Sequence, residues 1–272
     1  MDKTLIYTTL FIDDQKYAEL FYDWVFSIRT LGEYKGDILV GDYGIKKEFI
    51  DRFKNYNINF VKLPDRGKYT ISNYRNIDMI PILEKYDIDY KFAHFDVDIW
   101  FQNSINPLFE KLDNIESCYF GIEQGRMCRW RGPNEQIEID KYNTIQQKLN
   151  GFVFGGWIAG RYKPFLEKLK LMRDTFNSPG WNLDEWGTDQ CMVTYLFDFN
   201  KDDSTGDKWG KSYYFCDFID NKWKIQDELS KRYNISDDVT GVHLVTFEKE
   251  NEDRRFKQSH PKLFEQEWKK IE

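Results

Sequence analysis

The sequence contains no apolar stretch long enough to cross a membrane. The longest uncharged apolar run, GFVFGGWIAG at residues 151–160, is ten residues long, about half of the roughly 20 that a membrane helix requires. Residues 1–9, MDKTLIYTT, lead directly into a strand-like run without a separate apolar signal segment and cleavage site. We therefore expect a protein that has no membrane span and is not secreted, with the cytoplasm as its compartment.

Cysteine is scarce, and basic residues do not predominate. The four cysteines include no C-x-x-C pair, which argues against a zinc knuckle or a dithiol redox motif, and we expect reduced thiols: Cys118, Cys128, Cys191 and Cys216. The chain has 39 Lys and Arg against 46 Asp and Glu, for a net charge of −7. Because nonspecific affinity for nucleic acid comes mainly from clustered cations, we expect no nucleic-acid partner. A small anionic ligand would need local groups of the protein or a metal ion to offset the negative charge of the chain.

Large apolar side chains are abundant. Hydrophobic residues make up 41% of the 272 residues, with 22 Phe, 17 Tyr and 9 Trp. That composition excludes disorder, and a chain of this length can bury a single large core without disulfides or structural metals. We find no internal repeat or linker that divides the chain, so the default is one globular domain.

Strand-like and helix-like segments alternate over roughly the first 115 residues. Apolar residues recur at three- and four-residue steps from Tyr17 to Leu31, and short apolar or β-branched runs lie between the helix-like segments. This alternation predicts an α/β fold with a largely parallel sheet, which binds ligands beyond the carboxyl ends of its strands. The expected strands are 4–10, 37–41, 58–63 and 91–101, and the expected helices are 17–31, 46–56 and 72–86, the last interrupted by Pro81.

The second half of the chain is less regular. We expect buried strands at 117–123 and 152–159 and helices at 163–176 and 188–197. The polar segment 124–150 is more typical of a long functional loop or insertion than of a core element. The segment 248–272 mixes acidic and basic residues and predicts a solvated helical tail.

Two carboxylates, Asp96 and Asp98, end an apolar strand in the sequence FDVD. Strand side chains alternate between faces, so both can project to the same side where the strand opens into a loop. The two negative charges would repel each other unless a cation lies between them. Mg²⁺ or Mn²⁺, which take oxygen ligands, would account for the pair. The structural alternative is an acidic strand end that caps the following turn.

The segment from Tyr74 to Glu110 resembles the nucleotide-sugar glycosyltransferases of the GT-A fold. It is most similar to the retaining family 8 group that includes glycogenin and lipopolysaccharide galactosyltransferases. In that group an aromatic-Arg pair opens a helix, a strand ends in an acidic-x-acidic pair, and Leu-Phe follows about ten residues later. The matching residues here are Tyr74-Arg75, Asp96-Val97-Asp98 and Leu108-Phe109.

The resemblance recurs downstream in the same order. GTDQCMVTYLF, from Gly187 to Phe197, is similar to the Asp-Gln segment that the family places beside the anomeric carbon of the sugar. His243 and Lys249 have the spacing of the family's H-x-x-G-x-x-K motif, although Thr246 replaces its glycine. FVFGG at residues 152–156 looks like the FGG segment of the blood-group-type retaining transferases.

The resemblance implies a metal-dependent site for a nucleotide-diphosphate sugar. Mn²⁺, or Mg²⁺, would be held by Asp96, Asp98 and His243 and would neutralise the diphosphate leaving group. Asp189 and Gln190 would lie beside the anomeric carbon. The implied donor contacts come from Thr8 and Thr9 at the nucleoside, Arg75 and Lys249 at phosphate or sugar, and the backbone at Gly155 and Gly156.

The resemblance also implies one GT-A catalytic domain over residues 1–247, followed by the charged tail at 248–272. Residues 1–115 would bind the nucleotide-sugar, and residues 116–247 would hold the acceptor and catalytic groups. Trp157, Trp181 and Trp186 crowd the presumed acceptor side, although core packing is the better interpretation for any one of them. The sequence does not indicate an oligomeric state.

The expected function is transfer of a sugar, with UDP-sugar as the favoured donor, to a glycan or protein acceptor with retention of configuration. An inverting enzyme would instead use Asp189, Asp184 or Glu185 as general base. A non-catalytic sugar-binding domain derived from a transferase is the non-enzyme alternative. A dehalogenase-type phosphatase is disfavoured because Trp100 stands where Thr or Val is needed. A sugar-nucleotide pyrophosphorylase is disfavoured because TTLFIDDQ at 8–15 contains no glycine.

Overall fold

A computed structural model of the protein describes residues 3–12, 15–53, 56–66, 70–101, 103–124, 127–204, 213–217 and 240–245. Lys249 and the segment 248–272, where we expect a charged tail, lie outside the described residues. None of the helices in the described ranges combines the length and the apolar character of a membrane-crossing segment.

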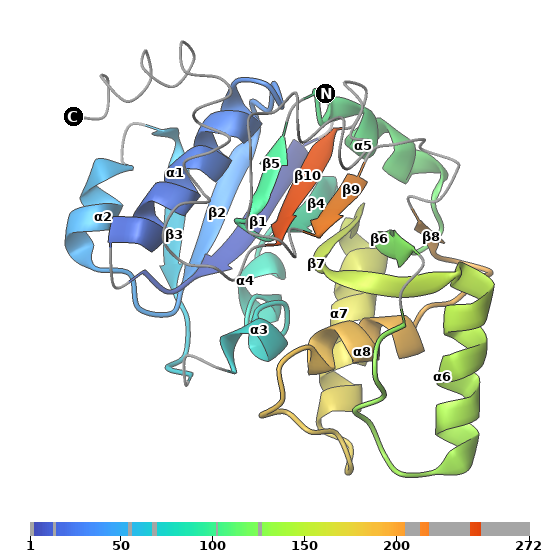
Figure 1. The fold of residues 1–272 in the computed structure, drawn as a ribbon. Helices are drawn as coiled ribbons and strands as arrows, with labels where there is room; N and C mark the ends of the chain where they lie inside the picture. The colour runs from blue at the N-terminus through green and yellow to red at the C-terminus, as the bar shows by residue number, and fades with distance from the viewer. Residues whose placement is uncertain are drawn as a thin grey trace.

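A seven-stranded sheet forms the centre of the molecule, in the order β3-β2-β1-β4-β7-β6-β8 (Figure 1). Neighbours from β3 to β4 are parallel, as are β6 and β8, whereas β7 runs antiparallel to both β4 and β6. The predicted α/β fold with a mixed, mostly parallel sheet is confirmed. The strands are β1 (Lys3–Leu10), β2 (Asp37–Asp42), β3 (Ile58–Lys62), β4 (Tyr90–Phe95), β6 (Cys118–Gln124), β7 (Gly151–Arg161) and β8 (Asp203–Ser204).

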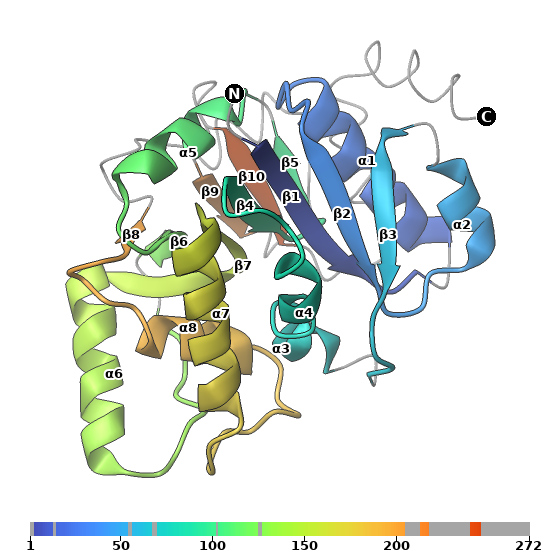
Figure 2. The ribbon, with the colours of Figure 1, turned by 180° about the vertical axis from the view of Figure 1, so that it is seen from behind.

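Apolar side chains of the central strands cover both faces of this sheet. On β1, Ile6 belongs to one hydrophobic cluster and Leu5 and Tyr7 to another, because consecutive strand side chains point to opposite faces. Helices α1 (Gln15–Arg29), α2 (Lys47–Arg52) and α5 (Asn106–Lys111) contribute to the first cluster. Helices α4 (Ile80–Leu83), α7 (Tyr162–Phe176) and α8 (Thr188–Tyr195) contribute to the second, and Figure 2 shows α7 in front of the sheet and α1 behind it.

The expected strand over 91–101 is divided between two sheets. β4 ends at Phe95, and β5 (Ile99–Phe101) belongs to a separate three-stranded sheet of order β5-β10-β9, with β9 (Tyr213–Asp217) and β10 (Gly241–Val245). The turn between β4 and β5 contains both carboxylates of the FDVD sequence. Asp favours turns because its short side chain competes with the strand for backbone hydrogen bonds.

The expected helix over 72–86 is interrupted, as predicted, but the break lies before Pro81 and not at it. The structure has two short helices, α3 (Ile71–Tyr74) and α4, with a turn between them. Pro81 lies in the first turn of α4, where its missing N–H costs nothing. Within the turn, Asn76 accepts from Tyr7 Oη (2.6 Å) and Asp78 accepts from Tyr43 Oη (2.9 Å), so side chains of this turn bond to β1 and to the end of β2.

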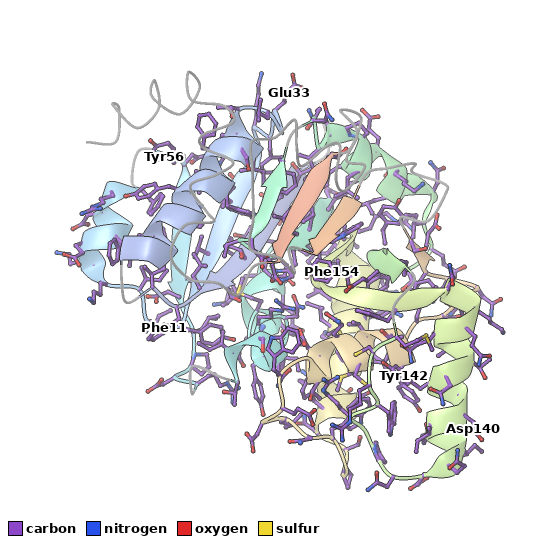
Figure 3. All side chains as sticks on the ribbon, in the orientation of Figure 1. Phe11, Glu33, Tyr56, Asp140, Tyr142 and Phe154 are labelled. Atoms are coloured by element: carbon purple, nitrogen blue, oxygen red, sulfur yellow. The ribbon has the colours of Figure 1, made fainter. Side chains whose placement is uncertain are left out.

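The segment 124–150, expected to be a loop, contains the helix α6 (Gln136–Leu149). Only a narrow face of α6 is buried, by Tyr142, Ile145 and Gln146, so its polar composition reflects its solvent side. Figure 3 shows Tyr142 turned toward the body of the molecule and Asp140 on the outer side. Asn150 ends the helix with a φ of 51°, in the left-handed region that Asn tolerates. The short 3₁₀ helix η2 (Leu112–Asn114) follows α5.

Replacement of Trp157 tests the packing between β4, β6 and β7. Its side chain is fully buried and lies 5.9 Å from the Phe95 ring and 5.4 Å from the Tyr119 ring, centroid to centroid. We expect Trp157→Ala to lower the free energy of unfolding by about 3–5 kcal/mol, because the cavity cannot close. Trp186→Ala, at a site 64% exposed, should change it by less than about 0.5 kcal/mol. Urea denaturation followed by circular dichroism measures both, and equal losses would contradict this assignment of Trp157 to the core.

Candidate active site

Asp96 lies at the carboxyl end of β4, where the chain leaves the large sheet. Its backbone N–H donates to Gly156 O on neighbouring β7 (2.7 Å), and its carbonyl accepts from Ile99 N (3.3 Å). These bonds hold the turn that contains Asp98. The Asp96 side chain remains 22% exposed, at the sheet edge where α/β proteins bind ligands.

Asp189 occupies the first turn of α8. The N-cap of α8 is Gly187, with a φ of 80°, a conformation that glycine adopts without strain. Thr188 is the first helical residue, and its hydroxyl donates to Asn182 O (2.5 Å) and Glu185 O (2.9 Å). The Asp189 side chain is 6% exposed, and its charge is favoured by the positive end of the helix dipole.

The guanidinium of Arg75 joins these two carboxylates. Its Nη1 donates to Asp96 Oδ1, and its Nη2 donates to Asp189 Oδ2 (2.6 Å) and to Gly155 O (2.8 Å). The Arg75 side chain is 12% exposed. Arg75 directly follows α3, so one side chain connects α3, β4, β7 and α8.

Charge compensation keeps this arrangement together. Burial of Arg75 disfavours its charged form, but the nearby Asp96 and Asp189 outweigh that cost, and the pKa of Arg75 is raised above its ordinary value. Two carboxylates this close would otherwise repel each other. The site therefore places a permanent cation between the strand-end carboxylate and the helix-start carboxylate.

Gly155 allows the close approach of Arg75 and Asp189 to β7, and Gly156 makes room for the Phe154 ring. A Cβ on Gly155 would lie 3.1 Å from both Arg75 Nη2 and Asp189 Oδ2, and one on Gly156 would lie 2.0 Å from the Phe154 ring. A side chain at either position would move the neighbouring groups. The two glycines predicted as donor contacts thus lie at the site, where each makes room for a side chain of the protein itself.

His94 is a buried residue of the site that our sequence analysis did not single out. Its Nε2 lies 3.3 Å from Asp96 Oδ1, without hydrogen-bond geometry, and its ring centroid is 5.0 Å from that of Tyr7. Burial lowers the pKa of His94, although Asp96 opposes the shift, so the ring is neutral at neutral pH. The i, i+2 spacing of His94 and Asp96 was a usable signal, because it places both on one face of the strand.

Thr8 and Thr9, the predicted nucleoside contacts, lie near the carboxyl end of β1. Thr8 is buried, and its hydroxyl oxygen has no hydrogen-bond partner among the described residues. Thr9 is half-buried and pairs with Gly41 in the parallel register with β2. Both lie toward the same edge of the sheet as Asp96.

The predicted metal ligands are brought together in part. Asp96 and Asp98 share one turn, and β10 pairs His243 with Ile99, the residue that follows Asp98. The structure describes the backbone of His243 and not its side chain. Among the described side chains, no group of three His, Cys, Asp or Glu residues could hold a metal. Two carboxylates and an imidazole on adjoining elements suit Mn²⁺, and Mn²⁺ or Mg²⁺ at this turn stays a prediction.

The remaining predicted residues lie along α8 and the loop before it. Gln190 is half-buried, and its Cα lies 3.4 Å from where a Cβ on Gly155 would be. Of the two carboxylates proposed as alternative bases, Asp184 is exposed, and Glu185 accepts from Arg131 Nε (3.1 Å). Cys118, Cys128 and Cys191 form no disulfide among the described residues, and the side chain of Cys216 is not described.

The tryptophans expected on the acceptor side have different surroundings. Trp157 belongs to the core, and Trp181 packs against the rings of Trp130 (5.2 Å) and Tyr195 (5.9 Å). Trp186 is exposed on the loop before α8. It is thus the tryptophan of these three that presents the largest surface to solvent.

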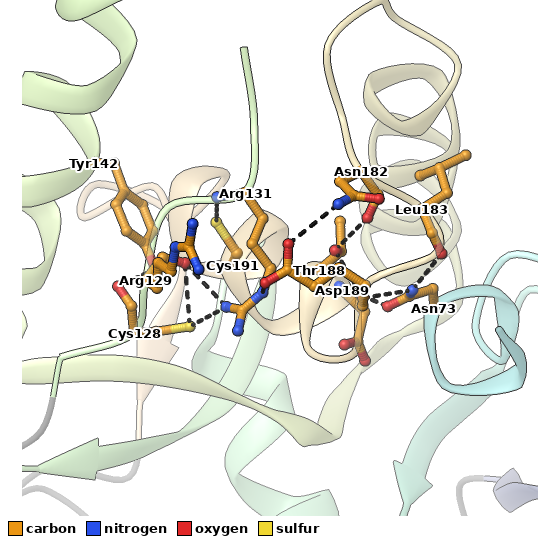
Figure 4. Close-up of polar contacts among 11 residues, drawn as sticks. Asn73, Cys128, Arg129, Arg131, Tyr142, Asn182, Leu183, Thr188, Asp189 and Cys191 are labelled. Carbon is orange, nitrogen blue, oxygen red and sulfur yellow. Dashed lines mark hydrogen bonds and ion pairs between the residues drawn. The ribbon is translucent and has the colours of Figure 1, made fainter. Parts of the chain in front are cut away.

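The loop from Asn182 to Gly187 is held from two sides, as Figure 4 shows. Asn73 of α3 donates through Nδ2 to Leu183 O (2.7 Å) and Glu185 O (3.0 Å), and its Oδ1 accepts from Asp189 N (3.1 Å). On the other side, Arg131 O accepts from Asn182 N (3.2 Å). Asn73 and Arg131 were not predicted as site residues from the sequence, because their partners lie far away along the chain.

No family model matches the sequence, and no curated protein matches it. The chain is similar in structure to the WbbM bifunctional glycosyltransferase in its apo form, with a TM-score of 0.55 and 13% identity, over 91% of this chain and 46% of that one. It is also similar to the galactosyltransferase LgtC in complex with donor and acceptor sugar analogues, with a TM-score of 0.54 and 13% identity, over 99% and 100% of the two chains. The chain thus spans about half the length of WbbM and all of LgtC. These similarities confirm the GT-A, Rossmann-like fold expected from the sequence.

Removal of Arg75 tests the charge compensation. We expect Arg75→Met to lower the free energy of unfolding by about 3 kcal/mol, because two carboxylates are left facing each other. Adding Asp189→Asn to that variant should restore at least about 1 kcal/mol of the loss, since it removes one of the two charges. Urea denaturation of both single variants and the double variant completes the cycle. Losses that add within about 0.5 kcal/mol would show that the two side chains do not interact.

Proposed function

We propose that the protein transfers a sugar from a nucleotide-diphosphate sugar, with UDP-sugar as the favoured donor, to a glycan or protein acceptor with retention at the anomeric carbon. The observation that carries this proposal is the contact of Arg75 with both Asp96 and Asp189 at the carboxyl edge of the sheet. A fold shared with glycosyltransferases supports it. LgtC, whose structure contains donor and acceptor sugar analogues, is an example of this fold that accommodates both reactants.

The diphosphate of the donor would lie against the turn of Asp96 and Asp98. These two carboxylates, with His243 on the adjoining strand, would hold Mn²⁺ or Mg²⁺. When bound, such a cation supplies positive charge that stabilises the diphosphate as leaving group. Arg75 has a permanent charge at the same place and can donate charge-assisted hydrogen bonds to phosphate or sugar oxygens. Lys249 is proposed to do the same for phosphate.

The nucleoside would lie over the end of β1. The buried Thr8 hydroxyl lacks a partner among the described residues, which favours a hydrogen bond to ligand there, since buried polar groups are normally satisfied. Thr9 is the adjacent, more exposed residue. Gly155 has no side chain that would crowd Arg75 and Asp189, and Gly156 is the next residue along β7.

Asp189 would stabilise the positive charge that develops at the anomeric carbon, with Gln190 beside the reacting face. The hydrogen bond from Arg75 (2.6 Å) fixes the orientation of the carboxylate before substrate binds, so little reorganisation is needed during reaction. If the enzyme inverts, Asp189 is better placed as base than Asp184, which is exposed, or Glu185, which is bonded to Arg131. The anomeric configuration of the product, read by NMR, separates the two mechanisms.

The acceptor would be bound near Trp186. This ring is exposed on a loop that Asn73 and Arg131 hold in place, three residues before Asp189. Sugar rings present an apolar face that packs on such an aromatic side chain, and a held loop loses little entropy on binding.

Metal removal tests the role of the D-x-D turn. We expect turnover of a nucleotide-sugar with Mn²⁺ to fall roughly 100-fold or more in excess EDTA, because the leaving group is no longer neutralised. Asp98→Ala should show the same loss in the presence of Mn²⁺. Asp87→Ala, at an exposed ion pair with Lys3, is the matched control and should retain activity. Undiminished turnover in EDTA or in Asp98→Ala would rule out the metal assignment.

Replacement of Trp186 tests the acceptor site. We expect Trp186→Ala to raise the KM for the acceptor about two- to tenfold, because one aromatic contact is lost. Hydrolysis of the donor without acceptor should be unchanged. Phe199→Ala removes another exposed aromatic side chain, beyond the end of α8, and serves as control. A change in donor hydrolysis equal to the change in transfer would place Trp186 on the donor side instead.

A further inference from the structure

The side chain of Asn73 makes hydrogen bonds with both of its polar atoms inside the protein. It is 2% exposed. Its Oδ1 accepts from Asp189 N (3.1 Å), and its Nδ2 donates to Leu183 O (2.7 Å) and Glu185 O (3.0 Å). Because one amide oxygen faces a donor and the amide nitrogen faces two acceptors, the orientation of the side chain is defined by its partners.

The start of α8 needs an acceptor that its own sequence does not supply. The first N–H groups of a helix have no partner within the helix, and a Ser, Thr, Asn or Asp at the N-cap usually accepts from one of them. The N-cap here is Gly187, which has no side chain and makes no side-chain cap hydrogen bond. Asn73, 116 positions away in the chain, accepts from the Asp189 N–H.

The same short segment also holds the carboxylate of Asp189. Arg75, two residues after Asn73, donates to Asp189 Oδ2 (2.6 Å). Asp189 is therefore held at two points, its backbone by Asn73 and its carboxylate by Arg75. The backbone contact sets where the carboxylate stands relative to Asp96, which the same guanidinium contacts.

We propose that Asn73 is a positioning residue for Asp189: it caps α8 from another helix and fixes the loop before it, and so sets the place of the carboxylate in the reaction centre. Asn73 bonds to backbone atoms only, and both of its polar side-chain atoms are engaged within the protein. This proposal rests on the proposed function for its effect on turnover, and on the structure alone for its effect on the Asp189 amide.

Asn73→Ala is the direct test, and Asn76→Ala is its matched control. Asn76 is a buried asparagine three residues further along, but its amide oxygen accepts from Tyr7 on β1 (2.6 Å) and not from α8. We expect Asn73→Ala to lower kcat roughly 10- to 100-fold, since a small misplacement of a catalytic group has an effect of that size. The KM for the donor should stay within about twofold of wild type, because no ground-state contact is lost. Asn76→Ala should retain most of the wild-type kcat.

Hydrogen exchange of the Asp189 amide, followed by NMR, gives a readout that does not depend on activity. The amide should exchange faster in Asn73→Ala than in wild type and at the wild-type rate in Asn76→Ala. If Asn73→Ala does not fold, the pair Asn73→Asp and Asn76→Asp replaces it. An aspartate at 73 would turn a carboxylate oxygen toward two carbonyls and should lower kcat, whereas one at 76 keeps the oxygen that Tyr7 contacts.

The outcomes separate this proposal from the proposed function. Wild-type protein that turns over no nucleotide-sugar with Mn²⁺ or Mg²⁺ would overturn the function, and the exchange of the Asp189 amide would still test the capping. An active wild type whose kcat falls equally in the Asn73 and Asn76 variants, or whose Asp189 amide is unaffected by Asn73→Ala, would overturn the positioning role.

Discussion

The arrangement of this molecule depends on one guanidinium between two carboxylates. Arg75 lies where β4 ends and where α8 begins, and it forms an ion pair with one acidic residue from each. Without Arg75, the two carboxylates would repel each other strongly, because they are close together in a partly buried site. The end of β4 and the start of α8 therefore both have to lie next to Arg75.

The residues around Arg75 hold its guanidinium and the two carboxylates in a fixed arrangement. Gly155 lets the Arg75 side chain and the Asp189 carboxylate approach β7, and its carbonyl accepts a hydrogen bond from the guanidinium (2.8 Å). His94 lies next to Asp96. Burial lowers the pKa of His94 and favours its neutral form, so the ring fills space beside Asp96 without adding a charge. Asn73 and Arg131 hold the loop before α8 from opposite sides. The guanidinium and the two carboxylates are thus held in place by the residues around them.

Local patterns were sufficient for most of the fold and for part of the site. The strands of the first half follow apolar runs, and α1 and α7 follow three- and four-residue periodicity, so each could be located within a few residues. The pair Asp96 and Asp98 was recognisable because a strand pattern ends there. α6 was missed because only a narrow face of it is buried, by Tyr142 and two neighbours, and its polar side resembles a loop.

Long-range contacts could not be read from the sequence. Asn73 meets Asp189 across 116 positions and Arg75 meets it across 114, and no local spacing encodes either pair. Gly187 takes the N-cap position of α8, and the Thr188 hydroxyl is engaged by Asn182 O and Glu185 O of the preceding loop. The roles of individual polar residues in this site follow from topology more than from residue type.

The most direct measurement is thermal unfolding with Mn²⁺ and a nucleoside diphosphate, added separately and together, for wild type and for Asp96→Asn. At 100 times its dissociation constant a ligand adds about 2.7 kcal/mol of stability. We expect a rise in Tm for wild type that needs both the cation and the nucleotide and is lost in Asp96→Asn. An equal rise without the cation, or an undiminished rise in Asp96→Asn, would contradict it.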